Sequence, residues 1–291
     1  MSGAVLLSIS ALIAAAPSPA SSAAPLPAPS PAPSPAPSPT PSPTPEPHYR
    51  LSPVTDAAVL VLSFGLAGTL ELILSTGELR PQAPGDPAAL LGIDRRVATS
   101  LEPARSALLG NLFLGLGLAG AAFDATLSPI LDRPDSFWTH LTLYAESAAL
   151  NIALADITKM AVRRPRPIAY HTVRDTGVPP ADTDASLSFY SLHTALAAGL
   201  SATATHLAFH RSPDGVEPWV ILGGGALLTA LVAWQRVEAR AHFPTDVLAG
   251  ALVGAAIGTL VPELHRVESS PVPVAVTVMA GPSSVGLAGA F

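Results

Sequence analysis

Long hydrophobic runs follow one another from about residue 54, and short polar segments separate them. The runs approach the ~20 residues that cross a bilayer, and several are close to the lower limit of about 17. The pattern predicts six helices, near Val54–Leu74, Ser106–Phe123, Phe137–Val162, Ser191–Phe209, Pro218–Trp234 and Thr245–Val261. We therefore expect an all-α protein whose core is a six-helix bundle.

Glycine and alanine are frequent inside these runs, as in LGGGALLTAL and LAGALVGAAIG. Small residues let helices approach closely in lipid, whereas each glycine in a soluble helix costs up to ~1 kcal/mol relative to alanine. Charged residues make up 12% of the chain, against about 25% in ordinary soluble domains. We expect a membrane-embedded bundle, and a soluble bundle is the alternative.

Charge and cysteine content exclude some classes of function. The net charge of -6 argues against a nucleic-acid partner, which would require a basic face. The chain has no cysteine, so disulfides and thiolate metal sites are excluded.

The two ends of the chain differ from its middle. Residues 1–23 resemble a secretory signal peptide, with an uncleaved anchor as the alternative. Residues 24–50 form a Pro-rich linker, and alternating prolines favour an extended spacer over a peptide-docking site. We expect the helical domain to span residues 51–266. In the tail, residues 267–291, the alternating sequence VPVAVTVMA predicts a short strand or strand pair.

The third predicted helix carries five polar side chains: His140, Glu146, Asn151, Asp156 and Lys159. Ionisable groups at membrane depth are costly and normally face a bundle interior or a polar cavity. We therefore expect this helix to be central and to flank a site.

Three polar clusters lie at helix ends. They are Lys159 with Arg166 and Pro167 after the third helix, Ser188–Ala195 before the fourth, and Gln235–Gly250 between the fifth and sixth. In a bundle of six antiparallel spans these three places share one end. The sequence thus predicts that the clusters meet.

The joint set of side chains suits a phosphate group. Guanidinium groups bind phosphate oxygens in pairs, and helix N-termini supply free amides. Lys159, the only lysine of the chain, adds a compact charge on a flexible stem. The candidate phosphate ligands are Lys159, Arg166, Ser191 and Arg236.

Two histidines add groups that titrate near neutrality. Asp246 lies four residues after His242 and is expected to accept a hydrogen bond from its imidazole, which leaves the other ring nitrogen as a nucleophile. His193 can then act as the acid that protonates a leaving oxygen.

These motifs, K-x6-R-P, Ser-x-His and R-x5-H-x3-D, resemble the signature of the type 2 phosphatidic acid phosphatase and vanadium haloperoxidase superfamily. The resemblance covers roughly residues 56–264. It implies a phosphohistidine on His242, an acid role for His193, an orienting role for Asp246, and a phosphate ligand in the backbone near Leu192. No metal or other cofactor would be needed. The implied substrates are membrane lipid phosphates, such as phosphatidic acid or polyprenyl pyrophosphates, and the implied location is the bacterial cell envelope.

The chain departs from the family pattern at two positions. The usual Gly between Ser and His is Leu192, and the usual Ser before the third-motif Arg is Gln235. Leu192 would either turn away and leave its amide free or crowd the phosphate. A catalytically weak protein that binds lipid head groups is therefore one alternative. A soluble periplasmic acid phosphatase is another, and a vanadate-dependent peroxidase is a more remote one.

Single residues of the motifs have simpler explanations. Arg163, Arg164 and Arg166 could act only as charges that fix membrane topology, and a lone histidine is more often structural than catalytic. The joint spacing favours the site, while Arg163, Arg164, Glu238 and Arg240 are interpreted as solvated charges.

A cleaved signal with six crossings would put the site on the cytoplasmic side, whereas envelope members of the family generally act on the outer face. The sequence leaves the side of the membrane and the oligomeric state open.

Overall fold

The computed structural model describes residues 49–76, 79–102, 104–132, 136–267, 275–281 and 284–290. The predicted signal peptide and almost all of the predicted Pro-rich linker lie outside these residues. The chain divides into two units, one formed by Pro47–Val267 and the other by Met1–Glu46 with Glu268–Phe291. We call the first the helical unit.

Eight α helices make up the described part of the helical unit. They are α1 (Pro53–Ser75), α2 (Gly92–Thr99), α3 (Leu108–Leu131), α4 (Ser136–Val162), α5 (Pro167–Thr176), α6 (Leu192–Arg211), α7 (Glu217–Glu238) and α8 (Pro244–His265). Two short 3-10 turns, Pro87–Ala89 and Thr183–Ser186, complete it. The six long helices match the six predicted ones, but the count of six is wrong. The helices α2 and α5 are too short and too polar to show in a hydrophobic pattern.

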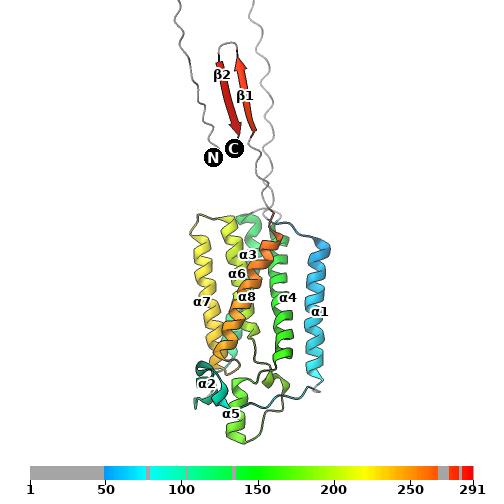
Figure 1. Cartoon of the computed structure of the whole chain (residues 1–291), viewed down its shortest axis with the longest axis vertical. Coiled ribbons are helices and arrows are strands. Elements are labelled where there is room, and N and C mark those ends of the chain that lie inside the picture. Colours follow the sequence, from blue (N-terminus) through cyan, green and yellow to red (C-terminus); the bar gives the residue numbers. More distant parts are fainter. Residues whose placement is uncertain are drawn as a thin grey trace, which may run out of the picture. The chain divides into compact units, whose positions relative to one another are not determined.

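The six long helices run up and down beside one another, and α2 and α5 lie together at one end (Figure 1). The chain enters and leaves the unit at the opposite end, where Tyr49 pairs with Arg266 and the amide of Arg50 donates to the carbonyl oxygen of His265 at 2.8 Å. α4 packs against α1, α3, α6 and α8, as expected for a central helix.

Four of the long helices, α1, α3, α7 and α8, are long and apolar enough to cross a membrane. They expose large apolar side chains, among them Leu62, Phe123, Leu227 and Leu252. Large apolar side chains exposed in such number mark contact with lipid or protein. The prediction that all six helices are this apolar is wrong for α4 and α6, whose polar side chains lower their hydropathy. The helical unit is therefore that of an integral membrane protein.

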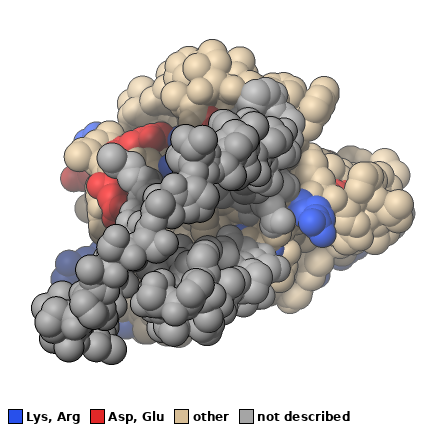
Figure 2. Space-filling view, turned by 90° about the horizontal axis from the view of Figure 1, so that it is seen from above, with Lys and Arg blue, Asp and Glu red and all other residues tan. Residues whose placement is uncertain are grey.

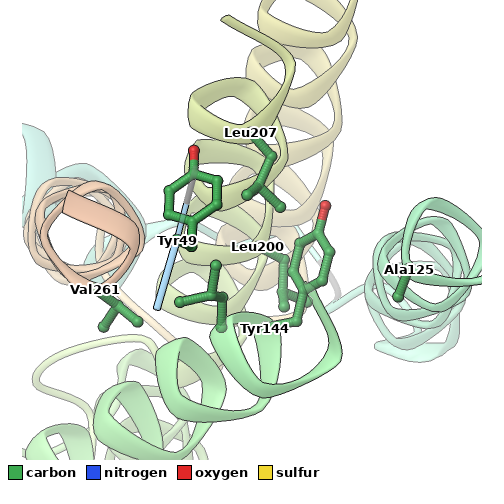
Figure 3. Packing of buried hydrophobic residues seen from close by; sticks show 7 residues of the cluster. Tyr49, Ala125, Tyr144, Leu200, Leu207 and Val261 are labelled. Carbon is green, nitrogen blue, oxygen red and sulfur yellow. The ribbon is translucent and has the colours of Figure 1, made fainter. Parts of the chain in front are cut away.

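A cluster of buried hydrophobic residues joins several helices near the end where Tyr49 lies (Figure 3). Leu200 and Leu207 of α6 meet Tyr144 of α4, and Ala125 of α3 and Val261 of α8 face them from either side. Because α6 sits among the other helices, its small residues rather than large ones fill most of its buried positions.

A seam of glycines brings α8 against α6. A side chain at Gly254 would come within 2.1 Å of the carbonyl oxygen of Ala195, and one at Gly258 equally close to that of Gly199. Gly250 contacts the backbone of Ser191 in the same way. Small residues at four-residue spacing allow this approach between helices. The seam fixes the start of α8 beside the start of α6, where two of the predicted motifs lie.

The other unit contains an antiparallel pair of strands, β1 (Ala275–Gly281) and β2 (Ser284–Ala290), in which Ala275 faces Ala290. The pair confirms the strands that the alternating tail predicts.

Candidate functional site

The three predicted clusters lie at the end of the helical unit that holds α2 and α5 (Figure 1). Lys159 is in the last turn of α4, Arg166 directly precedes α5, and Ser191 and His193 begin α6. Arg236 is in the last turn of α7, His242 lies between α7 and α8, and Asp246 is in the first turn of α8. Left-handed backbone at Arg163 and Arg240 turns the chain sharply after α4 and α7.

The charges of three cations reach both histidines. The charges of Lys159, Arg166 and Arg236 act on the imidazole of His193 and on that of His242. Burial lowers the pKa of His242 well below its ordinary value, and these three charges lower it further. His242 is therefore neutral near pH 7, the form in which an imidazole can attack an electrophile.

The carbonyl oxygen of Ser188 orients His242. It accepts a hydrogen bond of 2.7 Å from Nδ1 of the imidazole. A neutral ring that donates through Nδ1 carries its lone pair on Nε2. The expected hydrogen bond from His242 to Asp246 is replaced by this one, because Asp246 is occupied by other donors.

Asp246 fixes the position of Ser188, the residue that is hydrogen-bonded to His242. Its fully buried carboxylate accepts from the hydroxyl of Ser188 at 2.5 Å and from the amide of Phe243 at 2.9 Å. A guanidinium nitrogen of Arg164 donates to it at 2.5 Å. Asp246 thus fixes Phe243, which follows His242 in the chain, and Ser188, which contacts its imidazole. Its influence on His242 passes through Ser188.

The network continues to α2. Arg164 also pairs with Asp94 at 2.8 Å, and its guanidinium carbon lies 4.2 Å from the ring centre of Phe243. The fully buried Asp94 further accepts from the hydroxyl of Thr245 at 2.7 Å. The interpretation of Arg164 as a solvated charge is therefore wrong. Asp94 could not be found from the sequence, because α2 was not predicted.

Arg240 was also expected in solvent but is buried, and it bonds to Nδ1 of His171 at 2.6 Å. It fastens α5 to the turn between α7 and α8.

The three cations differ in how many of their hydrogen-bond donors already have a partner in the protein. Arg236 is 8% exposed, and its Nε has no hydrogen-bond partner among the described residues. Arg166 pairs with Asp184 at 2.6 Å and donates to the carbonyl oxygen of Ala241 at 3.3 Å. Nζ of Lys159 lies 3.5 Å from Oδ1 of Asp156. A buried guanidinium with a free donor is costly to leave unpaired, which makes Arg236 the strongest anion-binding candidate of the three.

The start of α6 supplies the second kind of donor. The hydroxyl of Ser191 caps the helix by accepting from the amide and hydroxyl of Thr194, at 3.4 Å and 3.0 Å. Leu192 and His193 occupy the first two helical positions, whose amides have no partner within a helix. Ser191 was expected to bind phosphate directly, but its hydroxyl is fully buried in the cap. The amides after it are the groups suited to an anion.

A side chain of α3 contacts His193. Its Nε2 lies 3.0 Å from the side-chain oxygen of Asn111, in the first turn of α3. No motif pointed to Asn111, because the contact depends on how α3 packs beside α6.

The three motifs lie within a region that matches a known family. Residues 140–269 match the family model of the PAP2 superfamily. This region belongs to the PAP2 superfamily. The PAP2 region, as we call residues 140–269, contains all three motifs and so confirms the resemblance.

A similar solved structure is that of the first transmembrane PAP2 type phosphatidylglycerolphosphate phosphatase from Bacillus subtilis. It is 20% identical, the match covers 72% of this chain and 94% of that one, and the TM-score is 0.40. No curated protein matches the sequence.

Leu192 does not need the backbone freedom of the glycine that is usual in this family. No positive φ occurs there, and its half-buried side chain packs with Ala155, Tyr190 and Ala195. The side chain has a hydrophobic place of its own beside α4 and α6. Gln235 is buried, with Oε1 unpaired among the described residues.

Replacing Leu192 with Gly should therefore give no gain in turnover of a phosphate ester. It should lower thermal stability, because it removes buried apolar contacts and adds a flexible residue to α6. Steady-state kinetics and a melting curve measure the two effects. A several-fold rise in kcat would show instead that the leucine crowds the substrate.

Proposed function

We propose that the PAP2 region hydrolyses phosphate monoesters of membrane lipids through a phosphohistidine on His242. The observation that carries the proposal is a neutral, buried imidazole whose Nδ1 is hydrogen-bonded, among three cations and a helix N-terminus. Such a site combines a preset nucleophile with groups that stabilise a phosphoryl oxyanion. Phosphatidic acid and polyprenyl pyrophosphates are the proposed substrate types.

The reaction has two steps. In the first, Nε2 of His242 forms a bond to phosphorus while the bond to the lipid oxygen breaks. His193, which carries a second proton while the anionic phosphate is bound beside the three cations, gives that proton to the lipid oxygen. In the second, His193 takes a proton from water as the water oxygen attacks phosphorus and the nitrogen–phosphorus bond breaks. The products are inorganic phosphate and the lipid alcohol from phosphatidic acid, or inorganic phosphate and the lipid monophosphate from a polyprenyl pyrophosphate, and both histidines return to their starting states. Arg236, Arg166, Lys159 and the first amides of α6 hold the phosphoryl oxygens throughout.

An apolar groove next to the site supports a lipid substrate over a water-soluble one. It has a volume of about 460 Å³ and runs between α6, α7 and α8, with Val247 and Leu248 at one end of its lining. Val247 directly follows Asp246. An acyl or prenyl chain in this groove would carry its phosphate toward the site while staying at membrane depth.

The test is phosphate release by the purified full-length protein in detergent micelles that contain phosphatidic acid. We expect turnover of the lipid with a higher kcat/KM than turnover of a water-soluble aryl phosphate. The reverse preference would favour the soluble acid phosphatase type. Binding of the lipid without any release would favour a lipid-phosphate-binding protein.

Filling the groove should separate lipid from soluble substrates. Ala251 lines it, and Ala251→Phe should raise KM for phosphatidic acid several-fold while leaving hydrolysis of an aryl phosphate near its wild-type rate. The matched control is Ala256→Phe, an exposed position of the same helix that does not line the groove. Equal effects of both variants on the lipid would exclude the groove from binding.

The pH profile should report the cations around His242. Because Arg166 lowers the pKa of His242, Arg166→Gln should raise that pKa and move the acid limb of kcat/KM to higher pH. Ionisation of the substrate contributes equally in both proteins and cancels in the comparison. Arg163→Gln is the control, since Arg163 does not act on this imidazole. An unmoved limb in Arg166→Gln would contradict the nucleophile's assignment.

A further inference from the structure

A second polar cluster lies at the end of the helical unit opposite the PAP2 motifs. It consists of Asp56 at the start of α1, Glu146 of α4 and His265 at the end of α8, and we call it the distal triad. One ligand atom of each residue lies within 4.8 Å of the others. In Figure 2, which looks onto this end, Asp and Glu side chains gather on one part of the visible surface. The carboxylates of the distal triad are themselves buried, since Asp56 is 5% and Glu146 is 2% exposed.

The ring of His265 is oriented so that one of its nitrogens can bind a metal ion. Nδ1 of His265 lies 2.8 Å from the carbonyl oxygen of Val261, to which it donates. This contact leaves Nε2 directed at the two carboxylates, 3.4 Å from Oδ1 of Asp56 and 3.5 Å from Oε2 of Glu146. A histidine that binds a metal usually donates its other ring N–H to a carbonyl or carboxylate in this way.

The distances fit a shared cation better than an ion pair. Hydrogen bonds between a charged nitrogen and a carboxylate are about 2.7–2.9 Å long, and both contacts of Nε2 are longer. Ligands about 2.1 Å from a tetrahedral Zn²⁺ ion lie about 3.4 Å from one another. Nε2 of His265 is thus separated from each carboxylate oxygen as two neighbouring ligands of one ion are, and all three ligand atoms lie within 4.8 Å of one another.

Charge balance leads to the same conclusion. Two buried carboxylates face one histidine, and no Lys or Arg of the described residues forms an ion pair with any of the three. Oε1 of Glu146 is buried without a hydrogen-bond partner among the same residues. An uncompensated buried carboxylate is strongly unfavourable, so buried charges are paired or bind metals.

We propose that the distal triad binds a divalent transition metal, Zn²⁺ or an ion of similar preference, which fastens α1 to α4 and α8. One imidazole and two carboxylates are a ligand set that Zn²⁺ accepts. α1 needs such a fastening because it packs mainly on α4 and buries only Asp56, Ser63 and Ala67 among its described side chains. The metal would be structural, and the proposal is independent of the phosphatase chemistry at the other end.

The test uses the full-length protein, purified in detergent without a metal-affinity step, stripped with a chelator and then titrated with Zn²⁺. Metal content by mass spectrometry should reach one tightly held Zn²⁺ per chain, and Zn²⁺ should raise the melting temperature. Glu146→Gln, which keeps the shape of the side chain, should weaken Zn²⁺ binding by roughly tenfold or more and abolish the rise in melting temperature.

A neighbouring group supplies the control. His206, His210 and Glu263 also place three ligand atoms together, so His210→Gln tests whether the metal is there instead. Loss of Zn²⁺ in His210→Gln but not in Glu146→Gln would overturn the proposal, as would a stripped protein that takes up none. If Glu146→Gln does not fold, X-ray absorption on the wild type decides: one imidazole among oxygen ligands supports the distal triad, and two imidazoles contradict it.

Discussion

His242→Ala should abolish phosphate release from phosphatidic acid, with a fall in kcat on the order of 10⁴-fold or more. In the proposed mechanism the imidazole supplies the nitrogen that bonds to phosphorus, and the surrounding network orients it, so the variant has lost the nucleophile. Phosphate release by wild type and variant, at matched protein and detergent concentrations, measures the loss. Rapid quenching with a radiolabelled substrate should trap an acid-labile phosphoprotein from wild type and none from the variant.

The matched control for this experiment is His206→Ala, a histidine of α6 whose ring lies beside Tyr49, where the chain enters the helical unit. It should keep the wild-type rate. Wild-type turnover by His242→Ala would remove the phosphohistidine mechanism altogether. A labelled phosphoprotein that persists in His242→Ala would move the nucleophile to another residue.

Asp246→Ala should destabilise the protein by about 3–5 kcal/mol, the cost of removing one partner from a buried ion pair. Arg164 would keep Asp94 but lose its second carboxylate, and the hydroxyl of Ser188 and the amide of Phe243 would lose their acceptor. Activity should fall as well, because Ser188 would no longer be fixed against His242. Denaturant or thermal unfolding in detergent measures the stability, and kinetics on the folded fraction measures the rate.

The comparison is Asp184→Ala, which breaks the ion pair to Arg166. Asp184 is 61% exposed in its side chain, and an exposed pair contributes about 0–1 kcal/mol. A loss of stability in Asp246→Ala no larger than in Asp184→Ala would show that the buried network adds nothing to the fold.

The long helices could be predicted from the sequence because each is a continuous apolar run between polar breaks. The common end of the three motifs followed from counting antiparallel spans. The short helices α2 and α5 could not be predicted in this way. Their amphipathic sequences lie among polar segments, and only packing against the ends of the bundle gives them a fixed place.

The positions of His242 and Arg236 at the junction of α7 and α8 were predictable from the motif spacing, and their roles stay predictions. The candidate site was not predictable where a neighbour in space decides the contact. Asp246 was expected to hold His242 because four residues separate them, yet the start of α8 turns its carboxylate toward Ser188 and Arg164. Arg164 looked like one of several surface arginines, and its place in the network depends on an ion pair with Asp94, which is 70 residues away in the chain.

The pairing of Tyr49 with Arg266 determines how the protein's orientation can be measured. The chain enters and leaves the helical unit at one end of its long helices, while the PAP2 motifs lie at the other end. A label placed at either boundary of this unit reports the side of the membrane on which that boundary lies. The proposed lipid phosphate substrate would then come from the opposite leaflet.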